Sequence, residues 1–112
     1  MLTENDLMLG ERLLLLRRRI GVTQKEAAQA YNVPHGVYGR WERNLPTGHA
    51  VPEVHLEGGV LPHEECLVHR LRHGLTQAAV SERTQYCKLW VRKMERNQAN
   101  PQPLLDYWHA TV

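Results

Sequence analysis

The amino-acid sequence predicts an all-α protein made of two tandem copies of a helix-turn-helix unit. The first observation is an internal repeat: residues 11–44 align with residues 64–97 without a gap, and ten of the 34 pairs are identical. Chance would give roughly two identities at average residue frequencies. The second is that the copies end almost identically, as WERN and MERN, 53 residues apart. The third is a short helix, a tight break and a helix with a polar outer face in the first copy.

The first helix is expected over residues 4–19. Thr3 and Asp6 have the spacing of a capping box, in which a hydroxyl accepts from a backbone N–H and a carboxylate accepts in return. Gly21 supplies a left-handed stop at the other end. The expected core stripe consists of Leu9, Leu13, Leu16 and Ile20.

The second and third helices are expected over residues 24–31 and from Pro34 to about Arg43. Thr23 and Glu26 form another capping box, Asn32 tolerates the left-handed conformation at the break, and proline suits a first helical turn. Val33, Tyr38 and Trp41 are predicted on the core side. The outer face is predicted to carry His35, Gly36, Gly39, Arg40 and Arg43.

The same pattern gives the domain organisation. We predict a first helix-turn-helix unit over residues 1–44, a linker over residues 45–62, and a second unit over residues 63–112. The linker contains three prolines and three glycines, with a short extended piece expected over 54–56. The first unit therefore lacks a clear fourth helix, whereas the residues after Pro101 can supply one to the second unit.

Composition and charge narrow the class of protein. Lys and Arg total 14 against 12 for Asp and Glu, a net charge of +2 that does not by itself indicate nucleic acid. The excess lies after Glu57, where 7 basic residues face 5 acidic ones. Two cysteines without zinc spacing favour reduced thiols, and the N-terminus lacks signal-peptide features. We expect a soluble cytoplasmic protein, associated with the nucleoid and not with a membrane.

At these residues the sequence resembles a known family. The stretch LGERLLLLRRRIGVTQKEAAQAYNVPHGVYGRWERNLP is similar to the Cro and phage-repressor type (XRE-like) helix-turn-helix. The stretch HEECLVHRLRHGLTQAAVSERTQYCKLWVRKMERNQANP keeps the G-L-T-Q and M-E-R-N parts in a second copy. The resemblance implies two lambda-repressor-like units. Asn44 and Asn97 stand where the family usually has glycine, but asparagine also tolerates the left-handed helix stop.

The resemblance also implies structural roles for charged residues. Arg17 with Glu42, and Arg70 with Glu95, occupy positions where the family often joins its first and third helices by a partly buried ion pair. Gln24 and Gln77 open the second helices. There the family's glutamine touches a DNA phosphate or braces the recognition helix from behind, and a solvated helix start is the plainer alternative.

The third helix of each copy is the candidate DNA-reading element. In the second copy, Lys88, Arg92 and Arg96 recur four apart, with Lys93 beside them, as a basic stripe suited to guanine edges and phosphates. Trp90 is predicted either to pack in the core, which we favour slightly, or to contact a thymine methyl. In the first copy, two glycines keep the outer face of the third helix low, so the face is suited to close approach by DNA or a protein. Its residues are His35, Gly36, Gly39, Arg40 and Arg43.

Other chemistry is not expected. Cys66, His69 and His73 share one helix face, but the first two align with core leucines, so a buried thiol and histidine are favoured over a metal site. No phosphate loop, activated nucleophile or carboxylate pair is recognisable. We therefore predict no enzyme, no cofactor, no metal and no small-molecule substrate.

The predicted function is sequence-specific binding to a double-stranded DNA operator by a small autoregulatory repressor of phage or plasmid type. It would act as a homodimer or an intramolecular pseudo-dimer. The surplus apolar residues Leu2, Leu7, Leu14 and Leu15 would bury against the other unit or a second chain. One alternative is a protein-binding module, such as an antitoxin or an inhibitor of a partner enzyme. An architectural DNA binder ranks third, because it would need a larger basic excess.

Overall fold

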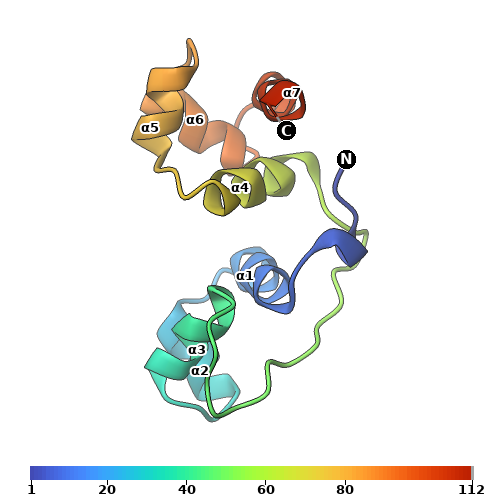
Figure 1. The fold of residues 1–112 in the computed structure, drawn as a ribbon, viewed down its shortest axis with the longest axis vertical. Coiled ribbons are helices and arrows are strands. Elements are labelled where there is room, and N and C mark those ends of the chain that lie inside the picture. The colour runs from blue at the N-terminus through green and yellow to red at the C-terminus, as the bar shows by residue number, and fades with distance from the viewer. Residues whose placement is uncertain (112) are drawn as a thin grey trace. The chain divides into compact units, whose positions relative to one another are not determined.

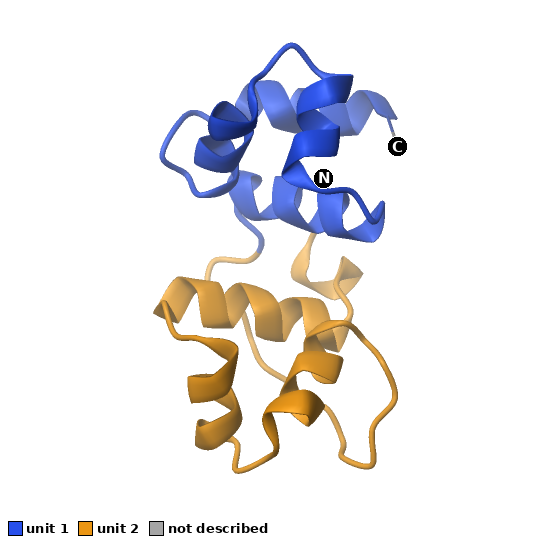
Figure 2. Cartoon of the chain, turned by 90° about the vertical axis from the view of Figure 1, so that its left-hand side faces the viewer, with its two compact units in different colours: residues 1, 60–112 blue, residues 2–59 orange. Residues whose placement is uncertain are grey.

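The computed structural model describes residues 1–111, and over that range the all-α prediction is confirmed. These residues form seven α-helices and one 3-10 helix, without a strand (Figure 1). The chain divides into two compact units (Figure 2). The N-terminal unit, orange in the figure, comprises residues 2–59. The C-terminal unit, blue, begins at residue 60 and includes Met1.

The internal repeat is visible in the helix boundaries. In the N-terminal unit, α1 spans Leu9–Ile20, α2 spans Gln24–Ala30 and α3 spans His35–Glu42. In the C-terminal unit, α4 spans Pro62–Arg72, α5 spans Gln77–Arg83, α6 spans Lys88–Glu95 and α7 spans Gln102–Thr111. Helices α5 and α6 therefore begin and end 53 residues after α2 and α3.

Left-handed residues end the helices where the sequence predicts them. Gly21, Asn32, Asn44 and Asn97 all have positive φ, of 85° for the glycine and 57° for each asparagine. The break before α6 is built differently, because Thr84 is extended and its hydroxyl donates to the Val80 carbonyl at 3.0 Å. The two copies thus reach the same helix spacing by different turn chemistry.

The first helix begins later than predicted. Residues Glu4–Asp6 form only a 3-10 helix, η1. The predicted capping box of Thr3 and Asp6 lies at its N-terminal end. Leu7 then turns to extended backbone with φ of −91° and ψ of 141°, and its side chain is buried. The α-helix starts at Leu9, where the carboxylate of Glu11 accepts from the Met8 N–H at 2.9 Å. A second helix-start signal therefore overrides the first.

The predicted apolar stripe on α1 is wrong at its ends. Leu9 and Ile20 are exposed and Leu16 is half-buried, whereas Leu13 and Leu15 are buried. Of the residues assigned to the surplus set, Leu7 and Leu15 are buried and Leu14 is half-buried. The set therefore does not offer the exposed surface that the homodimer expectation needed.

The core of the N-terminal unit lies between α3 and the two helices that pack on it, α1 and α2. Leu13, Ala27, Ala28, Tyr38 and Trp41 form it, with Val33 half-buried at the margin. Tyr38 and Trp41 meet edge to face, with ring centroids 6.0 Å apart. The predicted core side of α3 is therefore occupied by the two aromatic residues.

The segment predicted as a linker belongs largely to the N-terminal unit. Residues 43–61 contain no helix or strand, yet Val51 and Val54 pack on the core and the Trp41 indole donates to the His49 carbonyl at 3.3 Å. Its far end is held by Glu4, which accepts from the Leu56 N–H at 2.8 Å. That hydrogen bond is the main reason why the pKa of Glu4 lies below its usual value. The segment thus covers the core without a fourth helix.

The C-terminal unit has the closing helix that its sequence predicts. Helix α4 packs against both α6 and α7, and α5 packs against α6. Leu104, Leu105 and Trp108 of α7 are buried with residues from the other three helices. The shared core contains Cys66, Val80, Val91 and Met94.

Gly10 is expected to tolerate no side chain, which gives a test of how α1 meets the end of α3. Its N–H donates to the Asn44 side chain at 3.0 Å, and an added Cβ would overlap the Trp41 carbonyl oxygen. Gly10→Ala should therefore destabilise the protein by about 1–3 kcal/mol, measured by chemical unfolding followed by circular dichroism. Gly36→Ala, in open space on α3, is the matched control and should be neutral or stabilise by up to about 1 kcal/mol. Equal effects would contradict this packing.

Candidate nucleic-acid interface

A buried ion pair joins the first and third helices of each unit. Arg17 Nε donates to Glu42 Oε2 at 2.6 Å, and Arg70 Nε donates to Glu95 Oε2 at 2.8 Å. Both carboxylates are almost fully buried. Both predicted pairs are thus formed at the same place in the two copies, and they fix α3 and α6 against the helices behind them.

The two glutamines that open α2 and α5 complete these pairs. The Gln24 amide donates to Glu42 Oε1 at 2.9 Å, and the Gln77 amide donates to Glu95 Oε1 at 3.1 Å. Of the roles considered for these residues, bracing the third helix from behind is the one the structure contains. A phosphate contact through the same amide would require this hydrogen bond to break.

The arginines have a further fixed partner in each copy. Arg17 donates to the Val22 carbonyl at 3.1 Å, and Arg70 donates to the Leu75 carbonyl at 3.0 Å. For Arg17, burial opposes the charged form, but the hydrogen bond and charge of Glu42 outweigh it and raise the pKa above its usual value. Each guanidinium therefore holds the loop between two helices as well as the third helix.

The outer face of α6 is exposed and basic. Lys88 and Arg92 are exposed, as is Arg96 at the C-cap of α6, and Lys93 is half-buried, whereas Val91, Met94 and Glu95 turn to the core. The helix is therefore divided into a core side and a basic side, as the four-residue spacing of the stripe predicts.

Trp90 lies on this exposed face, so the slight preference for core packing was wrong. The residue is 44% exposed, and Lys93 Nζ lies 5.8 Å from the centre of its ring, within cation–π range. Leu89 beside it is also exposed. Val91 and Met94 are the apolar residues of α6 that fill the core. Trp90 therefore stays at the surface, as a flat apolar side chain among the cations.

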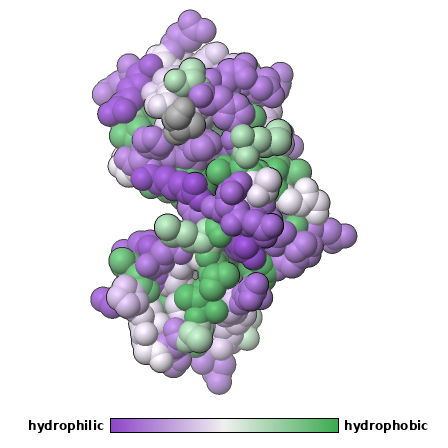
Figure 3. All heavy atoms as spheres, turned by 45° about the vertical axis from the view of Figure 1, so that its right-hand side comes forward, coloured by the Kyte–Doolittle hydropathy of each residue, from purple (hydrophilic) through white to green (hydrophobic). Residues whose placement is uncertain are grey.

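Burial of acidic side chains makes the surface of the C-terminal unit more basic than its composition suggests. Of the five acidic residues after residue 59, Glu64, Glu65 and Glu95 are buried, so Glu82 and Asp106 are the exposed ones. Five of the seven basic residues are exposed, and Arg70 and Lys93 are half-buried. In the face drawn in Figure 3, hydrophilic side chains predominate on this unit.

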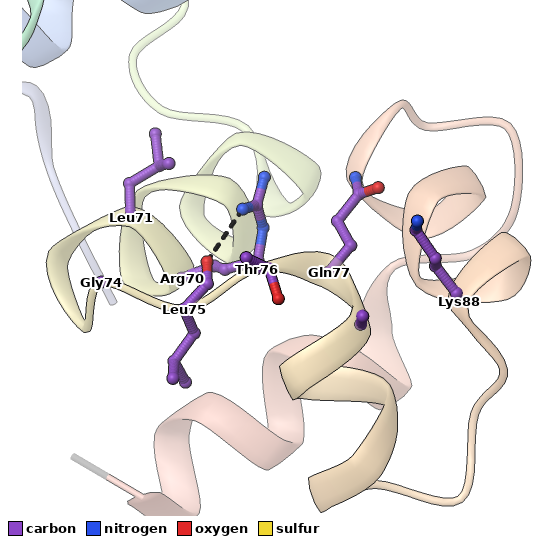
Figure 4. A pocket seen from close by; sticks show the side chains of 8 residues that line it. Arg70, Leu71, Gly74, Leu75, Thr76, Gln77 and Lys88 are labelled. Carbon is purple, nitrogen blue, oxygen red and sulfur yellow. Dashed lines mark hydrogen bonds between the residues drawn. The ribbon is translucent and has the colours of Figure 1, made fainter.

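A hollow of about 630 Å³ adjoins the start of α6. Arg70, Gln77 and Lys88 contribute its polar lining, and Leu71, Leu75 and Thr76 lie around it (Figure 4). The Arg70 guanidinium is tied to the Leu75 carbonyl within it, so Lys88 is the cation in its lining without such a tie. Lys88 therefore lines the hollow and also lies at the N-terminal end of the exposed face of α6.

The corresponding face of α3 is less suited to binding anions. His35, Gly36, Arg40 and Arg43 are exposed as predicted, but Gly39 is buried, because it faces the Gln24 side chain. The two arginines also contact backbone carbonyls, Arg40 that of Pro46 at 3.5 Å and Arg43 that of Gly39 at 3.3 Å. Gly39 therefore serves helix packing and is not part of an outer surface.

The residues considered for a metal do not form a site together. Cys66 and His69 are buried, as predicted, and burial raises the pKa of the Cys66 thiol to about 12. A thiol held in its protonated form is a poor metal ligand. The His73 ring contacts the His69 carbonyl, at 2.7 Å. Tertiary packing instead groups His69 with Glu65 and His109, and no local spacing pointed to His109.

Comparisons with known proteins assign no family to the chain: no protein-family model, curated protein or solved structure matches it. No helix within residues 1–111 combines the length and apolar character needed to cross a lipid bilayer.

Proposed function

We propose that the protein is a sequence-specific double-stranded DNA-binding repressor of the XRE-like helix-turn-helix type that its sequence resembles. The observation that carries the proposal is the exposed face of α6, with three cations four residues apart and a surface tryptophan beside them. The helix is held from behind by the Arg70, Glu95 and Gln77 contacts. A rigid helix with a basic, partly apolar outer face is what major-groove reading requires.

The chemistry of the base edges and phosphates indicates which residues of α6 would make each kind of contact. Arginine and lysine pair with the O6 and N7 acceptors of guanine or with phosphate oxygens, and an exposed indole suits a thymine methyl. Lys88, Trp90 and Arg92 would then face base edges, whereas Lys93 and Arg96 would contact the backbone. Repression would follow from covering a promoter, in the cytoplasm, with the chain's own gene as an expected target.

The N-terminal unit would occupy a second half-site or assemble copies. Its α3 face offers His35, Gly36, Arg40 and Arg43, a smaller set of donors than α6. Two units in one chain, or a homodimer, would match half-sites about 34 Å apart. In either arrangement we expect the C-terminal unit to contribute most of the base reading.

A protein-binding module is the second candidate, favoured by one feature of the N-terminal unit. An open, mainly apolar groove of about 240 Å³ lies along α1 and α2, lined by Leu13, Leu16, Ile20, Ala27 and Tyr31 among others. Ile20 and Tyr31 are exposed there. Such a groove fits the amphipathic helix of a partner, as an antitoxin or inhibitor would require. The basic face of α6 is not explained by this function.

Binding to labelled duplexes tests the proposal. We expect the chain to bind a duplex from upstream of its own gene more tightly than a scrambled duplex of the same composition, by about a thousandfold or more. The affinity should fall steeply between two salt concentrations, because bound cations release counterions from the phosphates. Equal affinity for both duplexes would sink the repressor proposal. Salt-insensitive binding of a defined protein partner with no DNA binding would favour the second candidate.

A further inference from the structure

Three side chains of the C-terminal unit converge on one point although they come from two helices. Glu65 and His69 lie one turn apart on α4, and His109 lies near the end of α7. Glu65 Oε2 is 3.1 Å from His69 Nε2 and 2.6 Å from His109 Nε2. One ligand atom from each residue lies within 4.8 Å of the other two.

We propose that Glu65, His69 and His109 form a binding site for Zn²⁺ or a similar first-row transition-metal ion. Two imidazole nitrogens and one carboxylate oxygen are a ligand set that suits zinc, and imidazole excludes the hard ions Mg²⁺ and Ca²⁺ as the preferred occupants. This site is separate from the exposed face of α6, so the proposal does not rest on DNA binding.

The spacing of the three atoms fits a metal with small adjustments. Ligand atoms at about 2.0–2.2 Å from zinc lie roughly 3.4 Å apart in a tetrahedral site. The distance from Glu65 to His69 is already close to this value, and the contact with His109 would lengthen. His109 can make that adjustment because its side chain is 38% exposed.

The surroundings hold two of the ligands in place. The Glu65 side chain is 2% exposed and that of His69 is 8% exposed. The His69 ring stacks on the buried Trp108 ring, with centroids 5.9 Å apart. The exposed edge at His109 gives the ion a route in and leaves room for water as a fourth ligand. The site is therefore largely preorganised, with one ligand free to close on the ion.

Binding would replace hydrogen bonds by metal bonds. To donate to one carboxylate oxygen, both imidazoles carry their proton on Nε2. Coordination through Nε2 requires that proton to leave this nitrogen; when a neutral ring takes it up at Nδ1 instead, the net charge of the ring does not change. The ion would then join α4 to α7 more firmly than the hydrogen bonds do.

Metal titration of the full chain tests the proposal. We would use a Cys87→Ser background, because Cys87 is an exposed thiol that also binds metals. Calorimetry with Zn²⁺, and visible absorption with Co²⁺ as a spectroscopic substitute, should show a single ion per chain in a four-coordinate site. The melting temperature should rise with Zn²⁺, since a ligand that binds the folded state stabilises it.

Single substitutions assign the site. His109→Ala should weaken Zn²⁺ binding by at least about tenfold and abolish the melting shift, and its half-exposed position should leave the fold intact by circular dichroism. The control His49→Ala removes an exposed histidine of the other unit and should leave both readouts unchanged. Absence of Zn²⁺ binding by the parent chain would overturn the proposal. So would equal binding by the parent and His109→Ala, or loss of binding with His49→Ala.

Discussion

Replacing Glu95 by glutamine is expected to destabilise the protein by about 3–5 kcal/mol, a large share of the 5–15 kcal/mol typical of a domain. The Glu95 side chain is fully buried and accepts from both Arg70 and Gln77, at 2.8 and 3.1 Å. Glutamine keeps the shape but removes the charge, so the Arg70 guanidinium stays largely buried without a counter-ion. Chemical unfolding gives the total loss, and amide hydrogen exchange in α4, α5 and α6 locates it.

The double variant Arg70→Met/Glu95→Leu is the control for this prediction. It removes both charges and fills the same space with apolar side chains, so it should be clearly more stable than Glu95→Gln. Glu42→Gln, at the equivalent place in the N-terminal unit, should cost a similar amount, because Glu42 is also buried and paired with Arg17 and Gln24. A Glu95→Gln protein as stable as the parent chain would show that the pair has no structural role.

The second large effect is expected at the exposed face of α6. If α6 reads DNA, Arg92→Ala should reduce affinity for the specific duplex by about 1–3 kcal/mol, roughly five- to 150-fold in Kd. Its affinity for the scrambled duplex should change less, because a base contact discriminates between sequences. Arg96→Ala, as a backbone contact, should weaken binding to both duplexes and lower the slope of log affinity against log salt by about 1. Fluorescence anisotropy at two or more salt concentrations measures both quantities.

Two further arginines separate reading by α6 from general attraction to DNA. Arg83 is exposed at the end of α5, in the same unit but outside α6, so Arg83→Ala controls for charge alone. Arg40 is an exposed cation on α3, aligned with Lys93 in the repeat, and selective loss with Arg40→Ala would move base reading to the N-terminal unit. If Arg83→Ala and Arg92→Ala reduce affinity for both duplexes equally, α6 has no special role.

Most features that the sequence determined by itself depend on a residue and its near neighbours in the chain. Asn32, Asn44 and Asn97 all adopt the left-handed conformation that their positions predict, because this preference depends on the residue and its immediate neighbours. Thr23 and Thr76 cap α2 and α5 at the same place in the two copies, because an N-cap acts on the first turn that follows it. The two ion pairs followed from the repeat and the family resemblance together.

The periodicity of apolar residues was a less reliable guide to which side of a short helix is buried. The stripe on α1 correctly placed Leu13 in the core, but Leu9 and Ile20 are exposed and Leu15, which was assigned to the surplus set, is buried. Likewise, Trp90 is exposed and Gly39 is buried. Which side of a short helix faces the core depends on the neighbours that cover it, and those neighbours are distant in sequence.

Only the tertiary structure decided the two features that bear most on function. The basic character of the C-terminal unit depends on which carboxylates are buried, and composition counts Glu64, Glu65 and Glu95 equally with the exposed ones. The cluster of Glu65, His69 and His109 joins residues 44 positions apart through the packing of α7 on α4. A sequence determines caps, turns and repeats because these act over a few residues, whereas burial and convergence depend on how separate helices pack.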